Sequence, residues 1–310
     1  NGMSYFISSD KYSPLDIWYP GSSSSGSVIY SASGIVGLIA NDDVSSAAFI
    51  ASRTGGANSL GSTSLKIYGT VLRDSIEGSS LADVIYGYDG NDAIHGLGGA
   101  DQIDAGAGND LVFIKASSLT DYTKLDGGAG SDTLNFSNPE SSMGSSFGTE
   151  AAVTFSLASS GIAQNFENIA GSRYDDQLTG DNNGNIIVGN GGADTISGAD
   201  GDDYLYGDGS SSANYADQKA HINSDYNLNS WGGNNDNLFG GAGNDYLEGN
   251  MGDDTLDGGI GQDTLTGGDG ADSFILRAGD GSSTLTLADI ITDFTDGADI
   301  LKLDSSVTYT

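Results

Sequence analysis

Residues 231–275 read WGGNNDNLF, GGAGNDYLE, GNMGDDTLD, GGIGQDTLT and GGDGADSFI, five consecutive units of nine residues. Each unit has an Asp at its sixth position and a large apolar residue at its eighth. The five acids are Asp236, Asp245, Asp254, Asp263 and Asp272. A nine-residue period fits neither a helix nor an alternating strand, and it predicts a solenoid. Because glycine permits positive φ, the first six residues of a unit are predicted to form a loop and the last three a short strand.

The acids are predicted to stack in columns. If each unit makes half a turn, units two apart lie about 4.8 Å from one another. Two carboxylates at that spacing repel by about 3.5 kcal/mol at an effective dielectric constant near 20. No Lys or Arg occurs in this stretch to offset the repulsion. Loops that offer only oxygen suit calcium, which accepts roughly six to eight such ligands. A flexible acidic linker would explain the charge, but not the apolar residue two places after every Asp.

Similar units occur earlier in the chain. A run of five consecutive units starts at Gly69. These units carry Asp74, Asp83, Asp92, Asp101 and Asp110 at the sixth position. A single unit then carries Asp132, and four more carry Asp176, Asn185, Asp194 and Asp203. The units of Asp74 and Asp83 have lost glycines, so calcium loops are less well supported there. Asn185 keeps an oxygen ligand without its charge, which predicts a weaker site.

These units resemble the GGxGxDxUx nonapeptide of the RTX (repeats-in-toxin) calcium-binding family. The spacer AAVTFSLASSGIAQNFENIAGSRYDDQLTGD, residues 151–181, and the D-x-I-x-D-F segment, residues 289–294, are also similar to parts of such proteins. The resemblance implies a parallel β-roll, several calcium ions, a final calcium ligand at Asp289, export by a type I secretion system, and folding on meeting calcium outside the cell. It implies no single activity, because enzymes, cytolysins, adhesins and surface-layer proteins all carry the repeat.

We therefore expect an all-β fold, a parallel β-roll or β-helix solenoid with irregular wider coils. The β-rich segment 1–68 is expected to be a small sandwich or an irregular first part of the solenoid that caps its end strand. The other expected parts are a first repeat block at 69–135, a spacer coil at 136–170, a second block at 171–209, an insertion loop at 210–230, a third block at 231–275 and C-terminal capping strands at 276–310.

Composition excludes several functions. The chain has 310 residues, a net charge of −33 and 43 acidic residues, of which only five are Glu. Such a field repels nucleic acid and anionic lipid. The chain has no cysteine and no apolar run long enough to span a membrane. It opens on Asn1 without a recognisable signal peptide, so we expect a piece of a longer or processed protein that acts outside the cell or on its surface.

Catalytic motifs are not convincing. HExxH is missing, and of the two histidines His95 is predicted to point outward from a strand while His221 lies in the insertion. A G-x-S-x-G string at residues 144–148 falls in a Ser/Gly-rich break, where it arises easily by chance. We expect no enzyme activity from this chain.

Two functions remain from different classes. The first is an extracellular calcium-binding structural or adhesive protein, such as a surface-layer, fibre or large adhesin segment, that folds and assembles on binding calcium. It would associate with itself or with a cell-surface partner, with the aromatic residues of 1–68 and 210–230 as contact regions. The alternative is the secretion and folding module of an enzyme or toxin whose catalytic domain lies outside this chain. The neighbouring coding sequence would distinguish the two.

Overall fold

A computed structural model describes residues 66–69, 71–79, 81–97, 99–114, 122–137, 151–159, 161–208, 234–277 and 288–303, together with three strands nearer the N-terminus. It divides into two compact units. The first comprises residues 1–132 with 162–165, and the second comprises 133–161 with 166–310. The described residues form strands and one short 3₁₀ turn, which confirms the all-β prediction.

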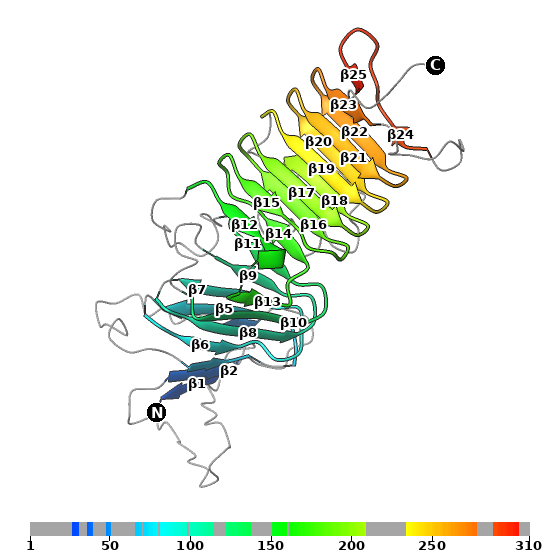
Figure 1. The fold of residues 1–310 in the computed structure, drawn as a ribbon. Coiled ribbons are helices and arrows are strands. Elements are labelled where there is room, and N and C mark those ends of the chain that lie inside the picture. The colour runs from blue at the N-terminus through cyan, green and yellow to red at the C-terminus, as the bar shows by residue number, and fades with distance from the viewer. Residues whose placement is uncertain are drawn as a thin grey trace. The chain divides into compact units, whose positions relative to one another are not determined.

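The first unit contains parallel strands in two sheets (Figure 1). In one sheet the order is β13-β10-β8-β6-β4, and in the other β3, β5, β7 and β9 follow one another. Outside these sheets, β1 (Ser27–Tyr30) pairs antiparallel with β2 (Val36–Ile39). The remaining strands are β3 (Ala48–Ile50), β4 (Lys66–Tyr68), β5 (Asp74–Ser79), β6 (Val84–Tyr86), β7 (Ala93–Leu97), β8 (Gln102–Ala107), β9 (Leu111–Phe113), β10 (Lys124–Ala129) and β13 (Ala163–Gln164). Because β3 and β4 pair with β5 and β6, both sheets begin before the first nonapeptide.

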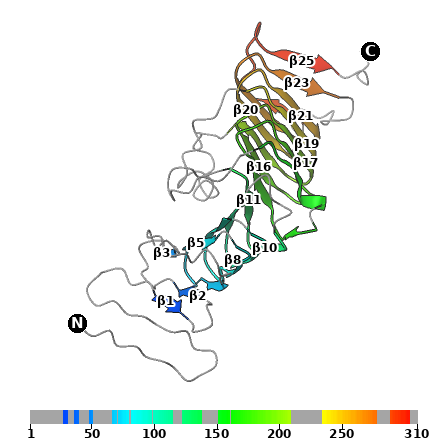
Figure 2. The same ribbon diagram turned by 90° about the vertical axis from the view of Figure 1, so that its left-hand side faces the viewer.

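The second unit also has two parallel sheets, whose strands stack in chain order (Figure 2). One sheet contains β11 (Thr133–Asn135), β14 (Asn168–Ala170), β16 (Ile186–Asn190), β18 (Tyr204–Asp208), β20 (Tyr246–Met251), β22 (Thr264–Asp269) and β24 (Ile290–Ile291). The other contains β12 (Thr154–Ser156), β15 (Gln177–Thr179), β17 (Thr195–Asp200), β19 (Asn237–Ala242), β21 (Thr255–Ile260), β23 (Ser273–Leu276) and β25 (Ile300–Leu303). The 3₁₀ turn η2 (Leu157–Ser159) follows β12.

The strand register confirms that each nonapeptide makes half a turn. Leu238 of β19 pairs with Leu256 of β21, and Leu247 of β20 pairs with Leu265 of β22. Paired strands of one sheet are therefore 18 residues apart in the sequence, and successive units contribute strands to the two sheets alternately. The eighth-position side chains point between the sheets and form the core. Their exposed fraction is at most 1% for Ile76, Ile85, Ile94, Ile103, Val112, Leu134, Leu178, Ile187, Ile196, Leu205, Leu238, Leu247, Leu256, Leu265 and Phe274.

The strands are longer than the sequence predicted. β21 begins at the seventh residue of one unit and continues through the first three residues of the next, so only the fourth to sixth residues form the turn. The prediction of a six-residue loop was wrong because a glycine at positive φ does not end the ladder. Gly241 has a φ of 119° and still pairs with Gly259 of the neighbouring coil.

Insertions leave the register intact. Ile196 of β17 pairs with Leu238 of β19, 42 positions along instead of 18, so 24 extra residues are accommodated without a slip. Residues 209–233 of this insertion lie outside the described part of the chain. In the spacer, β14 pairs with both β11 and β16, and β12 pairs with β15. The described part of the chain contains no helix with the length and hydrophobicity needed to span a bilayer.

Candidate metal centre

The sixth-position acids are joined in hydrogen-bonded columns. The backbone N–H of Asp236 donates to Oδ1 of Asp254 at 2.8 Å, and the N–H of Asp254 donates to Oδ1 of Asp272 at 2.9 Å. On the other side, the N–H of Asp245 donates to Oδ1 of Asp263 at 2.9 Å. The structure therefore has the two columns that the nine-residue period predicted for this block.

The same bond links the acids of the other blocks. In the first unit the columns are Asp74, Asp92, Asp110 and Asp132, and Asp83 and Asp101. In the second unit they are Asp176, Asp194, Asp236, Asp254, Asp272 and Asp299, and Asn185, Asp203, Asp245, Asp263 and Asp289. Every sixth-position residue named from the nonapeptides is at most 2% exposed, whereas Asp289 at the end of its column is half-buried.

The second carboxylate oxygen of many of these acids is buried without a hydrogen bond. This holds for Oδ2 of Asp92, Asp110, Asp194, Asp203, Asp236, Asp245 and Asp254. A buried charged oxygen without a partner is strongly unfavourable unless a cation compensates it. Unlike Oδ1, which is used to hold the coils together, Oδ2 is thus available to a ligand.

The first glycine of a unit makes room for this oxygen. A Cβ on Gly240 would lie closer than 3.0 Å to both Oδ2 of Asp245 and the carbonyl oxygen of Gly258 in the next coil. Two oxygens from different coils therefore converge on the space that the missing side chain leaves. The fourth position needs glycine for its backbone conformation. Gly252 has a φ of 126°, and a residue with a side chain is strained at that angle.

Burial raises the pKa of several column acids. Desolvation is the main cause, and it raises the pKa of Asp194 to about 9, of Asp236 to about 8 and of Asp254 to about 7. The backbone hydrogen bond to Oδ1 offsets part of this effect, while neighbouring acids of the column add to it. The charged columns therefore need a positive partner at neutral pH.

The donor set fits calcium. Within the described residues, no group of three or more His, Asp or Glu side chains is placed to hold a metal. An ion would therefore be held by carboxylates of one column together with backbone carbonyls of the glycine turns, an oxygen-only set that calcium accepts. When bound, calcium supplies the positive charge that turns repulsion along a column into attraction.

Two predicted ligands differ from the rest. Oδ2 of Asp176 accepts the backbone N–H of Ser172, and its Oδ1 accepts the Ser172 hydroxyl at 2.9 Å. Asn185 donates from Nδ2 to the carbonyl oxygen of Glu167, and its Oδ1 accepts the N–H of Asp181. Both residues stand in the columns, but their oxygens are already used by protein groups.

Asp299 also belongs to a column, although the nonapeptide pattern did not predict it. Its Oδ1 accepts the N–H of Asp272 at 3.0 Å and so ends the longer column of the second unit. The signal was present, because GADIL at residues 297–301 has the glycine, acid and apolar residue of GADSF at 270–274. An incomplete unit after the last full repeat is easily overlooked.

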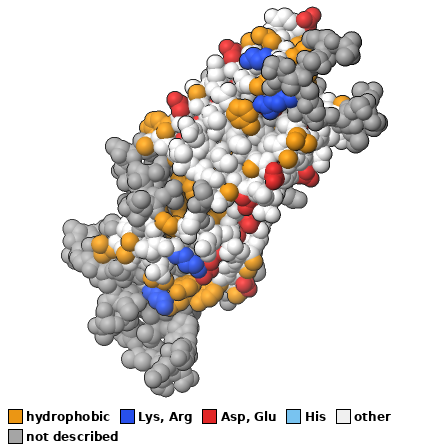
Figure 3. Space-filling view, viewed as in Figure 1, with side chains coloured by type: hydrophobic (Ala, Val, Ile, Leu, Met, Phe, Trp, Pro, Cys, Tyr) orange, Lys and Arg blue, Asp and Glu red, His pale blue; other side chains and the backbone are white. Residues whose placement is uncertain are grey.

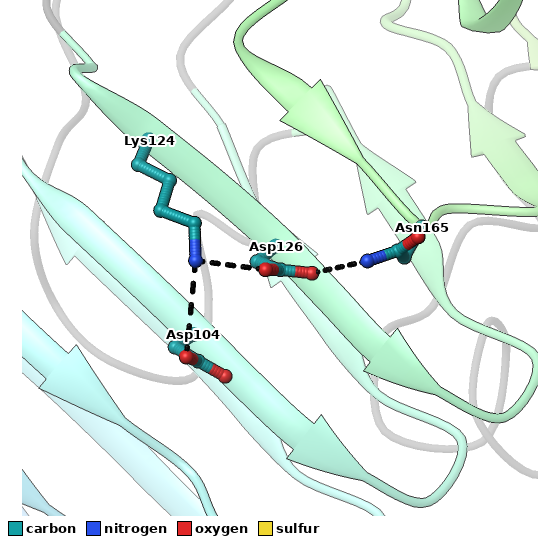
Figure 4. Close-up of polar contacts among 4 residues, drawn as sticks. All are labelled: Asp104, Lys124, Asp126 and Asn165. Atoms are coloured by element: carbon teal, nitrogen blue, oxygen red, sulfur yellow. Dashed lines mark hydrogen bonds and ion pairs between the residues drawn. The ribbon is translucent and has the colours of Figure 1, made fainter.

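Two acids outside the columns, Asp104 and Asp126, lie beside a protein cation instead. On the outer face of β8 and β10, Lys124 Nζ lies 2.8 Å from Oδ2 of Asp126 and 3.9 Å from Asp104 (Figure 4). Asn165 donates to Oδ1 of Asp126 at 2.7 Å (Figure 4). Burial alone would raise the pKa of Asp126, but the bonds from Lys124 and Asn165 hold it below its usual range. Acidic side chains are sparse on the face seen in Figure 3, in keeping with the burial of the columns.

His95 is a buried histidine. It is only 3% exposed, and its ring lies edge-on to Phe113 of the next coil at 5.6 Å between centroids. Desolvation lowers the pKa of His95 to about 3, so the imidazole is neutral. The sequence predicted only that His95 points outward from its strand, and aromatic packing covers that position. His221 and the G-x-S-x-G string at 144–148 lie outside the described residues.

A comparison with protein-family models matches the chain to the RTX calcium-binding nonapeptide repeat (4 copies). The matched residues are 68–112, 124–137, 179–211, 232–265 and 248–282. They cover most of the acid columns of both units, whereas the column acids Asp176, Asp289 and Asp299 lie outside the matched residues. No curated protein matches the chain.

Proposed function

Because this chain is an RTX repeat protein whose nonapeptides bind several calcium ions, we propose that it is an extracellular structural or adhesive protein stiffened by calcium. A surface layer, a fibre or a large adhesin is the kind of assembly to which such a segment would belong. Proteins that carry this repeat are typically secreted, which agrees with an acidic chain that has no cysteine.

The observation that carries the proposal is the length of the acid columns, one of which runs from Asp176 to Asp299. The second unit is built of stacked coils from β11 to β25. Their turns carry buried carboxylates, and Oδ2 of Asp194, Asp203, Asp236, Asp245 and Asp254 has no hydrogen bond. A β-roll of this kind is a calcium-binding scaffold and not a catalytic domain. Binding energy at sites that do not exist in the unfolded chain stabilises the fold, so calcium acts as a structural element.

Calcium is expected to fold the chain. With ten cationic residues against 43 acids, the calcium-free chain should be expanded, and millimolar calcium should produce the parallel β-structure. Circular dichroism and small-angle X-ray scattering in chelator and then in calcium would measure the transition. Magnesium at equal ionic strength is the control for simple charge screening. A β-spectrum that survives chelation at neutral pH would contradict calcium-dependent folding.

The assembly role requires self-association. Strands at the end of a solenoid have an unpaired edge, and such an edge can pair with another chain. In the second unit the end strand is β25, and the exposed fractions of its Ile300, Leu301 and Leu303 are 41–53%. Calcium would also reduce the charge repulsion that keeps copies apart. The proposed contact regions 1–68 and 210–230 lie largely outside the described residues.

Light scattering of the purified chain in calcium tests this role. The expected result is association in calcium, its loss in chelator, and a weaker association when residues 210–230 are replaced by a short Gly/Ser linker. A folded monomer at high concentration in calcium would contradict the structural role. It would favour the alternative, a secretion and folding module of a larger enzyme or toxin.

A further inference from the structure

Three tyrosines gather on the outer face of the sheet β13-β10-β8-β6-β4. Tyr68 of β4 pairs with Tyr86 of β6, and Tyr88 follows two residues later. Their rings are nearly parallel, with interplanar angles of 10–24° and centroid distances of 5.5 Å, 6.3 Å and 6.4 Å. Tyr68 and Tyr86 are half-buried, whereas Tyr88 is 48% exposed. The three rings therefore form one aromatic surface that solvent reaches.

Tyr88 occupies its place against its backbone preference. Its φ is 76°, and the matching positions of the next two coils in this sheet are Gly106, with a φ of 114°, and Gly128, with a φ of 105°. A bulky residue is strained in this region, whereas glycine adopts it freely. Since the ring is half exposed, packing of the core does not explain the tyrosine. Strain of this kind is typical of residues that bind a ligand.

A cation lies over the aromatic surface. Nζ of Lys66 is 5.3 Å from the ring centroid of Tyr68 and 5.6 Å from that of Tyr86. The ring faces attract the ammonium group and so hold it at the surface. An ammonium group has three N–H donors, so Lys66 supplies hydrogen bonds to a ligand that rests on the rings.

The neighbouring strands of the same face carry further hydrogen-bonding groups. Tyr86 pairs in the sheet with Asp104 of β8, which pairs with Asp126 of β10. Nζ of Lys124 lies 3.9 Å from Asp104 and 2.8 Å from Asp126, and Asn165 donates to Asp126 (Figure 4). These contacts fix the direction of the carboxylates. One half of the face is thus aromatic, and the other half presents oriented polar groups.

The face is close to neutral in a strongly acidic chain. Lys66 and Lys124 balance Asp104 and Asp126, whereas the whole chain has a net charge of −33. In Figure 3, Lys or Arg side chains lie beside hydrophobic and acidic ones over this part of the first unit. The field of the chain repels an anionic polymer. The centre of a protein–protein interface is depleted in Lys and Asp, which are abundant here. The remaining partner is a neutral polymer with both apolar and hydroxyl groups.

We propose that this face binds a neutral polysaccharide, whose sugar rings stack on the three tyrosines while its hydroxyls bond to Asp104, Lys124 and Asp126. A sugar ring has C–H groups on its faces and hydroxyls around its edge. It therefore matches an aromatic surface that lies next to charged hydrogen-bonding groups. The proposal rests on the adhesive role proposed above and names the chemistry of its cell-surface partner.

The substitution Tyr88→Gly tests the proposal without a cost to the fold, because it gives the coil the glycine of the next two coils and removes the strain. The matched control is Tyr204→Thr in the second unit. Tyr204 is 50% exposed, and the same row of its sheet has Thr264 two coils later. Circular dichroism over a calcium titration should give Tyr88→Gly a folding midpoint no higher than that of the original chain.

Affinity electrophoresis of the full chain in calcium would measure binding, with laminarin, dextran, mannan or xylan in the gel. Alginate is the charged comparison. We expect at least one neutral polymer to retard the original chain. Tyr88→Gly should weaken that binding about tenfold, and Asp104→Ala should weaken it as well, whereas the control variant should bind like the original chain.

Several results would overturn the proposal. These are no retardation by any of the four neutral polymers, retardation by alginate alone, and equal binding by Tyr88→Gly and the original chain. Loss of self-association in Tyr88→Gly, with no polysaccharide bound by the original chain, would identify the face as a contact between copies and would also overturn it. A folded monomer that binds a neutral polymer through Tyr88 would support the proposal and contradict only the assembly role.

Discussion

At the scale of single residues, the column acids differ in how their second oxygen is used. Oδ2 of Asp254 is buried without a hydrogen bond, whereas Oδ2 of Asp176 accepts the N–H of Ser172. Asp254→Asn should therefore raise the calcium midpoint of folding about tenfold, and Asp176→Asn should raise it less. Calcium titrations followed by circular dichroism would measure both shifts. Asp253→Asn, at an exposed acid of the same turn, controls for net charge. Equal shifts for the two buried positions would contradict the distinction.

The same acids predict an inverted pH dependence without calcium. Their folded-state pKa is raised, to about 6 for Asp110, 7 for Asp254 and 9 for Asp194, above the usual value of 3.8. The folded chain then binds more protons than the unfolded chain between these values, so its stability falls as pH rises. In calcium-free buffer, circular dichroism should show more β-structure at pH 5 than at pH 8, where the chain is expected to be expanded. Calcium reverses the trend, because it binds the deprotonated carboxylates. A calcium-free chain that is more stable at pH 8 would count against the raised values.

At the scale of the coil, the first glycine of a unit is needed for space. Gly240→Ala would push a methyl group against Oδ2 of Asp245 and a carbonyl of the next coil. We expect a loss of stability in calcium of about 1–3 kcal/mol, which is typical of overpacking, together with weaker calcium binding. Gly161→Ala is the control, since a Cβ there meets nothing within 4 Å. Urea unfolding of both variants in excess calcium would show whether only the first is destabilised.

The coil is also the scale at which sequence prediction succeeded best. A fixed acid and a fixed apolar residue in every unit determine the half turn, the two columns and the core, because one register satisfies them all. The strand length was not predictable from glycine content, since Gly241 combines a positive φ with ladder pairing. The burial of His95 was not predictable either, because it depends on Phe113 in the next coil. Such contacts have no signature within a single unit.

At the scale of the whole molecule, the roll should not need its insertion. The extra length between β17 and β19 is 24 residues, and deletion of residues 210–233 joins Gly209 to Asn234. The resulting string, GDGNND, has the acid again at its sixth position and restores the 18-residue spacing. We expect the deletion variant to fold at a similar calcium concentration and to keep its exchange protection in β16–β21. Failure to fold would show that the insertion is part of the scaffold.

The 18-residue spacing of paired strands also has a mechanical meaning. Within the second unit each coil pairs only with the coil before and the coil after it, so a pulling force can detach one coil without breaking the others. Every detached coil would release roughly 60 Å of extended chain. Ions held between the turns would have to leave one after another as the coils separate. Calcium concentration would then set the force at which such a segment lengthens, and a stretched segment could rewind when the load falls.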